Sequence, residues 1–336
     1  MIKFILKRIL AGMVVLLGVI VVTFAVTRLV PSKPELQWVG TRATAEQLEA
    51  ARIELGLDKS VPEQFIIYLK DLLHGDLGMS LQTKRPVADE IREYLPPTLE
   101  LVLISTIFAV IFGLGLGVLS ASRKNRWQDH LARFFSVGTV SLPTFWTALL
   151  FQVLFYKILQ LLPVGGMLSN HTQLFYQVPH VTGFLLLDCL LTGNFYILQD
   201  AAVHFIMPCA VLMLYPLGSV ARMTRSAMLE ILNEDYIKAA RSYGLKERAV
   251  LWKYALKNSL GPTATVVTLS IGYTLMNTFL VESIFNWPGI GSYISDAVMN
   301  MNYPAIMGVT IISAIAYVFL NLIADIIVAM DPRVRV

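Results

Sequence analysis

The side chains that most often do covalent, redox or metal chemistry are scarce in this sequence. There are two cysteines, Cys189 and Cys209, and five histidines. The cysteines form no CxxC pair, and the histidines lack the short spacings of metal ligands. No HExxH motif, no catalytic-triad spacing and no Gly-x4-Gly-Lys-Ser/Thr phosphate loop is present. We therefore predict no catalytic residue, no metal site and no cofactor, and a membrane enzyme is the weakest alternative.

A few polar residues and prolines lie inside or beside long apolar runs, where each needs a physical reason. We expect Glu282 to pair with a partner chain, to face the outer mouth of a pathway through the membrane, or to have a structural role. We favour the structural role. Asn277 lines a pathway or only bonds a neighbouring helix. Pro143 is a hinge candidate because proline removes a helix hydrogen bond, whereas Pro262 and Pro304 fit first-turn positions. Asn277, Glu282 and Pro143 are thus the candidates for a pathway or gate.

A basic, helix-prone segment, Glu234 to Leu260, lies between two apolar runs. The apolar residues before Gly244 recur at three- and four-residue intervals, which predicts one face of a helix. They are Leu229, Leu232, Tyr236, Ala239 and Tyr243. Gly244 can adopt the left-handed backbone that ends such a helix, and a second helix is expected from about Glu247 to Lys257. The segment is predicted to fold as helix, turn, helix.

The remaining side chains of this segment indicate docking or anchoring. Its basic residues are Lys238, Arg241, Lys246, Arg248, Lys253 and Lys257. Ala239 and Ala240 are small, so another surface could approach the first helix closely. The periodicity alone favours two interpretations equally. The helix is offered to a groove of another protein, or it lies on anionic lipid headgroups.

The elements that must position these residues are predicted to be membrane spans. Of the 336 residues, 56% are hydrophobic and 15% are charged, whereas soluble domains average about 25% charged residues. A helix needs about 20 apolar residues to cross the hydrocarbon, and six runs are long enough. They are Ile9 to Thr27, Leu101 to Ser122, Phe134 to Tyr156, Ala201 to Ala221, Asn258 to Val281 and Ala297 to Ala324. We predict an all-α membrane protein with six transmembrane helices.

The distribution of charge predicts the orientation of these spans. The first run is expected to be a retained span, because no small-x-small cleavage site follows it. Six spans place both termini on one side. If that side is the cytoplasm, the cytoplasmic segments carry 17 of the 27 Lys and Arg but 6 of the 23 Asp and Glu. The positive-inside rule therefore predicts cytoplasmic termini and a cytoplasmic segment 222–260.

The first outer loop, 31–97, is predicted to be a small helical subdomain. Thr44 to Gln47 and Ser60 to Glu63 each match a capping box. Short helices are expected at Ala45 to Leu55, Pro62 to Leu73 and Pro86 to Tyr94. The subdomain caps an outer mouth or docks a soluble partner. The uncharged run from Ile158 to Leu187 contains many helix breakers, so it is expected to be a partly structured loop or a partly re-entrant piece.

These expectations divide the chain into three parts. Residues 1–30 hold the N-terminus and the first transmembrane helix, and residues 31–97 form the external helical subdomain. Residues 98–336 form a transmembrane core of five helices, which includes the basic segment within 222–260.

Part of the basic segment resembles the EAA loop of bacterial ATP-binding-cassette importer permeases. That family has an E-A-A-x-x-x-G pattern, and Ala239, Ala240 and Gly244 match it. Lys238 stands where the family has glutamate, so no role of that glutamate is carried over. Tyr254 and Lys257 likewise replace a later isoleucine and proline of the pattern.

Further motifs are similar to the peptide and nickel branch of these permeases, and most closely to the first permease subunit of dipeptide importers. They include HGDLGMS at His74, PPTLEL at Pro96, VTGFLLLD at Val181, RMTRSAMLE at Arg222 and VESIFNWPGIG at Val281. The similarity spans nearly the whole chain. It implies a bacterial inner-membrane permease for dipeptides or short peptides, with nickel chelates, glutathione or another small solute as alternatives.

The resemblance also implies partners, which would be proteins and the lipid bilayer and not a nucleic acid. In such importers two similar permease subunits form the pore, two cytoplasmic ATPase subunits drive it, and an external binding protein delivers the solute. The implied contact with the ATPase comprises Tyr236, Lys238, Ala239, Ala240, Arg241, Gly244 and Leu245. An ion-coupled secondary transporter is the alternative of another class. It would predict internal repeats and a chain of carboxylates in the membrane, and the sequence shows neither.

Overall fold

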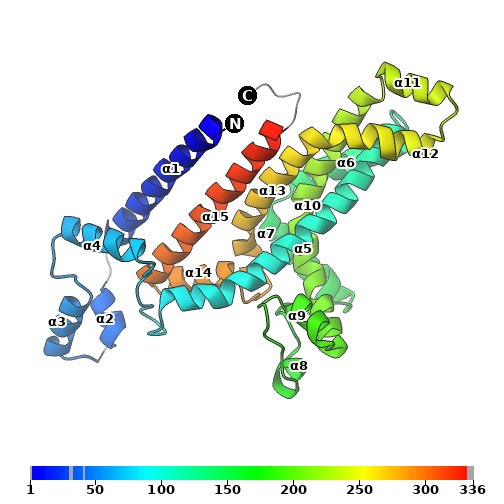
Figure 1. Ribbon diagram of the computed structural model, residues 1–336. Coiled ribbons are helices and arrows are strands. Elements are labelled where there is room, and N and C mark those ends of the chain that lie inside the picture. The colour runs from blue at the N-terminus through cyan, green and yellow to red at the C-terminus, as the bar shows by residue number, and fades with distance from the viewer. Residues whose placement is uncertain (1, 30–32, 41, 331–336) are drawn as a thin grey trace.

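The computed structural model describes residues 2–29, 33–40 and 42–330, and across these ranges the chain forms helices and no β-strand. Five long helices dominate the fold (Figure 1). They are α1 (Ile2–Leu29), α5 (Val87–Ser122), α10 (Phe195–Ile231), α13 (Leu256–Ile284) and α15 (Tyr303–Met330). Each is long and apolar enough to cross a membrane, and this confirms the predicted all-α membrane fold.

The third predicted span is broken into two helices. α6 (Trp127–Ser141) is followed by α7 (Thr144–Phe151), which continues as the π-helix η1 (Gln152–Ile158), and the two halves meet at a bend of 105°. Pro143 is the residue that caps α7. Proline lacks an N–H and disfavours helical backbone in the residue before it, so a break here follows from the sequence. The described residues therefore hold five unbroken candidate spans and one bent one.

α5 differs from its prediction because it begins much earlier. The expected short helix from Pro86 to Tyr94 is wrong as a separate element, since α5 runs through Pro96 and Pro97 without a break. These prolines free the carbonyls of Arg92 and Glu93, which are both exposed and can be hydrated. The predicted boundary at residue 97 therefore falls inside one rigid helix.

Two further boundaries differ from the sequence-based expectation. Pro262 lies inside α13 and not in its first turn, because the helix begins at Leu256. The carbonyl that Pro262 leaves without a donor belongs to Asn258, which is exposed. The sixth predicted span begins at Tyr303, because part of the apolar run folds as the separate helix α14 (Ile290–Met299). Pro304 does occupy the first turn of α15, as predicted.

The chain between α1 and α5, which the sequence analysis predicted to be an outer loop, contains three short helices, α2 (Pro34–Val39), α3 (Ala45–Glu54) and α4 (Val61–Leu73). Both predicted capping boxes are present. Gln47 and Thr44 exchange hydrogen bonds, and the Glu63 carboxylate accepts from the Ser60 amide at 3.1 Å. Between Ile158 and α10 lie α8 (Asn170–Phe175) and α9 (Leu185–Thr192), which is the partly structured loop that the breakers predicted.

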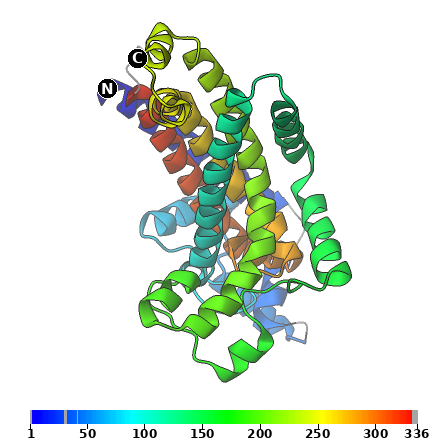
Figure 2. The same ribbon diagram turned by 90° about the vertical axis from the view of Figure 1, so that its right-hand side faces the viewer.

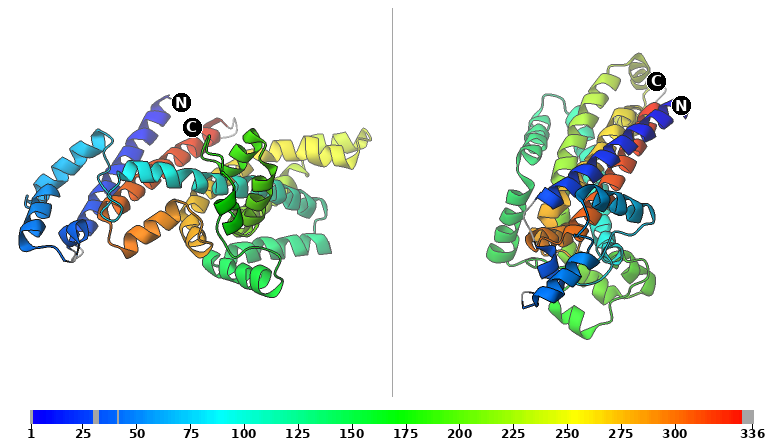
Figure 3. Two further views of the ribbon diagram at one scale, coloured as in Figure 1. Left: turned by 90° about the horizontal axis from the view of Figure 1, so that it is seen from below. Right: turned by 90° about the vertical axis from the view of Figure 1, so that its left-hand side faces the viewer.

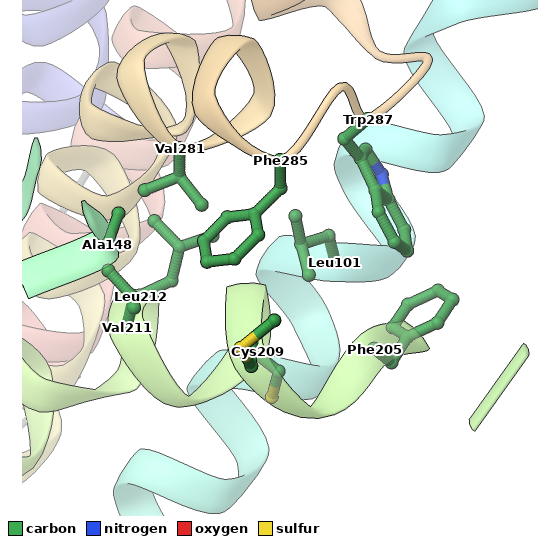
Figure 4. Packing of buried hydrophobic residues seen from close by; sticks show 10 residues of the cluster. Leu101, Ala148, Phe205, Cys209, Val211, Leu212, Val281, Phe285 and Trp287 are labelled. Carbon is green, nitrogen blue, oxygen red and sulfur yellow. The ribbon is translucent and has the colours of Figure 1, made fainter. Parts of the chain in front are cut away.

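The largest buried cluster lies where α5, α7, α10 and α13 meet (Figure 4). Phe285 extends from the end of α13 toward Leu101 of α5 and Leu212 of α10. The ring of Trp287 packs edge-on against Phe205, with 4.5 Å between centroids. Its indole N–H donates to the Pro97 carbonyl, so the polar end of this buried side chain is satisfied.

The molecule has two distinct ends (Figures 1 and 2). The start of α1, the end of α15 and the helix α11 (Asp235–Ser242) lie at one end. The short helices α2 to α4, α8, α9 and α14 lie at the other. α1 and α15 run side by side (Figure 3), and Arg8 and Asp325 join them by an ion pair of 3.0 Å. Asp325 thus has a partner within this chain.

Candidate functional site

The basic segment lies at the end of two helices that project beyond the core. α10 continues to Ile231, the chain turns, and α11 follows. Gly244 then adopts a φ of +75°, in the left-handed region that the sequence predicted. α12 (Glu247–Ala249) and the π-helix η2 (Val250–Ala255) come next and continue directly into α13. We call residues 235–255 the coupling segment.

The helix, turn, helix prediction is right in outline and wrong in its details. Leu229 belongs to α10, and Leu232 caps that helix, so the predicted stripe is divided between two helices. The second helix does not end near Lys257, because it merges with the span. The part of this segment after the Gly244 turn is therefore continuous with α13.

One face of α11 packs against the rest of the chain. Ile237 and Ala240 are the buried residues, and they pack with Val118 of α5, Met228 of α10 and Val250 of η2. The aromatic residues of the predicted stripe, Tyr236 and Tyr243, are exposed and lie outside this packed face. We call the exposed set Tyr236, Tyr243 and Leu245 the coupling surface; their exposed fractions are 42%, 86% and 40%.

Polar contacts hold the coupling segment in one shape. Arg241 donates to both carboxylate oxygens of Glu247 across the Gly244 turn, at 2.7 and 3.2 Å. Asn258 of α13 donates to the Tyr236 hydroxyl at 2.9 Å. The Lys238 ammonium lies 2.8 Å from the Asp235 carboxylate, and this hydrogen bond lowers the pKa of Asp235. The bonds join residues on both sides of the turn, so the segment is organised before any partner arrives.

Sequence reasoning missed a buried ion pair below this segment. The Asp129 carboxylate is completely covered and accepts from Arg225 Nε at 2.7 Å and Nη2 at 2.9 Å. It also accepts from the Ser120 hydroxyl and the Asn125 amide. The cluster ties the turn between α5 and α6 to α10. The one sequence signal was an acidic residue isolated among basic ones in the segment from Ala121 to Arg133.

Two of the pathway candidates meet at the break in the third span. A small cavity lies next to Pro143 and is lined by Asn277 of α13, Thr144 and Thr147 of α7, and Tyr215 of α10. The Asn277 side chain donates to the Tyr273 carbonyl at 2.9 Å. Tyr273 stacks on Tyr215 with ring centroids 3.7 Å apart. The sequence analysis named neither tyrosine, because only the packing of α10 on α13 brings the two rings together.

Glu282 lies apart from this cavity and is wholly buried within the chain. Its carboxylate accepts from the Thr98 hydroxyl at 2.7 Å, from the Gly291 amide at 2.5 Å and from the Ser292 amide at 3.3 Å. These contacts fasten the first turn of α14 to α5 and α13. These contacts lie within the chain, and the structural role of Glu282 stays a prediction.

No group of three or more potential metal ligands occurs in the part of the chain that the structure describes. Cys189 and Cys209 are both buried free thiols. Between η1 and α10, burial of Asp188 is outweighed by hydrogen bonds from Thr182 and from the amides of Val181 and Gly183, which lower the pKa of Asp188. Asp188 thus organises this connection, and the two thiols lie in separate clusters of buried residues.

Two family models together match most of the chain. Residues 113–336 match the model described as binding-protein-dependent transport system inner membrane component. Residues 1–102 match the model for the N-terminal part of such membrane components.

Several characterised proteins are similar over nearly their whole length. The probable D,D-dipeptide transport system permease protein DdpB of Escherichia coli is 43% identical, with 95% of this chain and 94% of that protein covered. The dipeptide transport system permease protein DppB of Alkalihalophilus pseudofirmus is 37% identical with both chains fully covered. The glutathione transport system permease protein GsiC of Pectobacterium atrosepticum is 32% identical, covering 100% of this chain and 99% of that protein.

The fold also has a counterpart among solved structures. A chain of the MetNI methionine ABC transporter, in an inward-facing conformation, superposes with a TM-score of 0.51. The match covers 69% of this chain and 92% of that chain at 17% sequence identity. At this identity the likeness concerns the arrangement of helices alone.

Proposed function

The chain belongs to the family of binding-protein-dependent transport system inner membrane components, and on this premise we propose that it carries dipeptides or other short peptides into the cell. Family membership confirms the resemblance seen in the motifs, and it makes the chain a membrane permease subunit of the ATP-binding-cassette class. The solute is inferred from the names of the dipeptide permeases at 43% and 37% identity. Glutathione is the alternative that the GsiC relative suggests.

The proposal assigns the energy source and the solute capture to other proteins. Two cytoplasmic ATPase subunits, a second homologous permease subunit and an external binding protein complete the transporter. ATP hydrolysis is assigned to the partners because the sequence has no phosphate-binding loop. The termini and the coupling segment are placed in the cytoplasm on the positive-inside rule. In support, these parts lie at one end of the molecule and the outer subdomain at the other (Figure 1).

The proposed coupling to the ATPase subunits is supported mainly by one observation. The coupling surface is exposed at the end of the molecule where α10 and α13 project beyond the core. Tyr236, Tyr243 and Leu245 are exposed aromatic and aliphatic side chains, held on a backbone that Ile237 and Ala240 anchor from below. Exposed apolar groups on a short amphipathic helix fit a groove of another protein. When ATP closes the ATPase pair, the segment is displaced, and α10 and α13 carry that displacement into the membrane. The nucleotide thereby shifts the bundle toward its outward-open state.

The experiment is a substitution on the coupling surface in the complete transporter. Tyr243→Ala removes the most exposed ring of the segment, while Ile237 and Ala240 keep their packing. We expect ATP-driven dipeptide uptake into proteoliposomes to fall at least tenfold, with unchanged amounts of permease in the membrane. ATPase subunits should also copurify less well with the variant. Ala240→Glu is a poorer test, because Ala240 is buried and the charge would unfold the segment itself.

Trp127→Ala is the matched control, since Trp127 is 70% exposed at the start of α6 and lies outside the coupling segment. It should leave uptake and copurification near wild-type levels. Full uptake and full ATPase retention in Tyr243→Ala would refute the coupling role. A complete transporter that moves no dipeptide under any condition would refute the proposed solute.

A further inference from the structure

A groove with both polar and apolar lining residues runs between α10 and α13. Tyr215, Ser219, Arg222 and Ser226 of α10 recur at intervals of four, three and four residues, so they share one face of that helix. This face meets Val266 and Ser270 of α13. The hollow between them has a volume of about 430 Å³, within the range of small-molecule sites.

Arg222 is the unusual member of this groove. No hydrogen bond or ion pair of Arg222 is present among the described residues, and the groove lining contains no carboxylate. Arg225, one turn further along the same helix, is by contrast fully engaged by Asp129. Ser219 and Ser226 lie on the same face of α10 as Arg222, and Ser270 of α13 also lines the groove, so the guanidinium has neutral hydrogen-bonding neighbours and no counter-ion in this lining. The groove is therefore suited to a solute and water.

The groove adjoins two further hollows, because Tyr215 lines all three. Tyr215 lines it and also lines the cavity beside Pro143 and Asn277. The same ring borders a third hollow of about 280 Å³ that reaches Tyr317 and Asn321 of α15. The Tyr215 and Tyr273 stack therefore lies beside the groove that contains Arg222.

We propose that the groove is a peptide-binding site in which Arg222 receives the C-terminal carboxylate of the solute. A guanidinium presents paired N–H donors that match a carboxylate, and the arginine is always charged. Ser219 and Ser226 flank it and can donate to the same oxygens or to peptide groups. Met223 and Leu269 supply adaptable apolar walls, which accept side chains of different shape. This inference rests on the proposed function, because it names the group by which a transported peptide is recognised.

The test uses the complete transporter in nanodiscs without the binding protein, so that the selectivity of that protein does not enter. A dipeptide with a photoreactive side chain and a free carboxylate is added and crosslinked by light. The permease is then digested, and the fragments that carry the label are identified. We expect labelling of 215–226 in α10 and 266–270 in α13. An unlabelled dipeptide should compete at least tenfold better than its C-terminal amide. In Arg222→Gln the two competitors should become equal, and Arg222→Lys should restore part of the preference.

Lys124→Gln is the control, because Lys124 is an exposed cation in the turn after α5 and lies outside the groove. It should keep the wild-type preference. An unchanged preference in Arg222→Gln, or no labelling in the groove, would overturn the site. An Arg222→Gln defect that appears only in nanodiscs with anionic lipid would also overturn it, in favour of a headgroup contact. Dipeptide uptake by the full transporter with its binding protein is measured in parallel. Normal uptake without groove labelling rejects this site alone, whereas absent uptake rejects the proposed solute.

Discussion

Glu282 illustrates how a charged residue can be retained inside an apolar helix. Its exposed fraction is zero, and three donors from α5 and the start of α14 satisfy its carboxylate. The amides of Gly291 and Ser292 are among the open N–H groups at the start of α14, so Glu282 acts as a cap supplied from another helix. The carboxylate thereby fixes α14 against the end of α13.

Replacing this carboxylate should destabilise the outer end of the molecule. In Glu282→Ala the buried Thr98 hydroxyl and Gly291 amide lose their acceptor. We expect the free energy of unfolding to fall by about 2–4 kcal/mol, the cost of leaving such donors unsatisfied. Thermal unfolding of the purified permease in detergent measures it. Ser283→Ala, at the exposed neighbouring position, should unfold at the wild-type temperature, and equal midpoints for both variants would contradict the capping role.

The Asp129 and Arg225 pair shows which residue contacts the sequence could not predict. The sequence analysis noticed Glu282 and Asn277 because each interrupts an apolar run. Asp129 lies in a polar turn, where a carboxylate is ordinary, and its partner is distant along the chain. Only the packing of α6 on α10 brings the two together. The stacking of Tyr215 on Tyr273 was likewise not predicted, because the two residues are distant along the chain and meet only where α10 packs on α13.

At the scale of elements, features that depend on neighbouring residues were predicted well from the sequence, and contacts between helices were not. Both capping boxes and the turn at Gly244 depend on residues close together in the chain, and the structure contains both boxes and the turn. The face of α11 that is buried depends on α5, α10 and η2, and the periodicity alone did not indicate which residues would pack against them. α5 likewise extends outward because its first turns pack Val87 and Ile91 against α14 and α15, which outweighs its two prolines.

The contact between α5 and α10 depends on glycines that permit a close approach. A Cβ on Gly117 would lie 2.6 Å from the Thr224 Cβ and 2.9 Å from the Ala221 carbonyl oxygen of α10. A Cβ on Gly115, half a turn away, would meet nothing within 4 Å. Small residues spaced four apart commonly allow membrane helices to pack in this way. Gly113 and Gly117 therefore form the contact, and Gly115 does not.

This difference predicts opposite effects for two similar substitutions. Gly117→Ala should force α5 and α10 apart and lower the unfolding free energy by about 1–3 kcal/mol, the usual cost of overpacking. Gly115→Ala should be neutral or stabilising by up to about 1 kcal/mol, because alanine favours helix more than glycine does. Thermal unfolding of the two variants in one detergent compares them directly. A larger loss in Gly115→Ala would show that the contact is not as described.

At the scale of the whole molecule, the two ends differ in what they offer to partners. One end presents the coupling surface and the ends of α1 and α15, and the other presents α2 to α4, α8 and α9 (Figure 2). Hydrophobic runs and charge asymmetry were sufficient to predict this arrangement. Pro143 indicated where the third span could bend, but neither the 105° angle of that bend nor the groove at Arg222 could be predicted, because both depend on how separate helices pack.

The proposed orientation can be tested with two equally exposed positions. Leu73 of α4 and Tyr243 after α11 are each 86% exposed, and they lie at opposite ends. The native thiols of Cys189 and Cys209 are 0% and 6% exposed, so they should react little with a water-soluble maleimide. In intact spheroplasts a membrane-impermeant maleimide should modify Leu73→Cys and spare Tyr243→Cys. In inside-out vesicles stripped of peripheral proteins the pattern should be reversed. Labelling of Tyr243→Cys from outside intact cells would place the coupling surface beyond the reach of any cytoplasmic ATPase, since ATP is available only within.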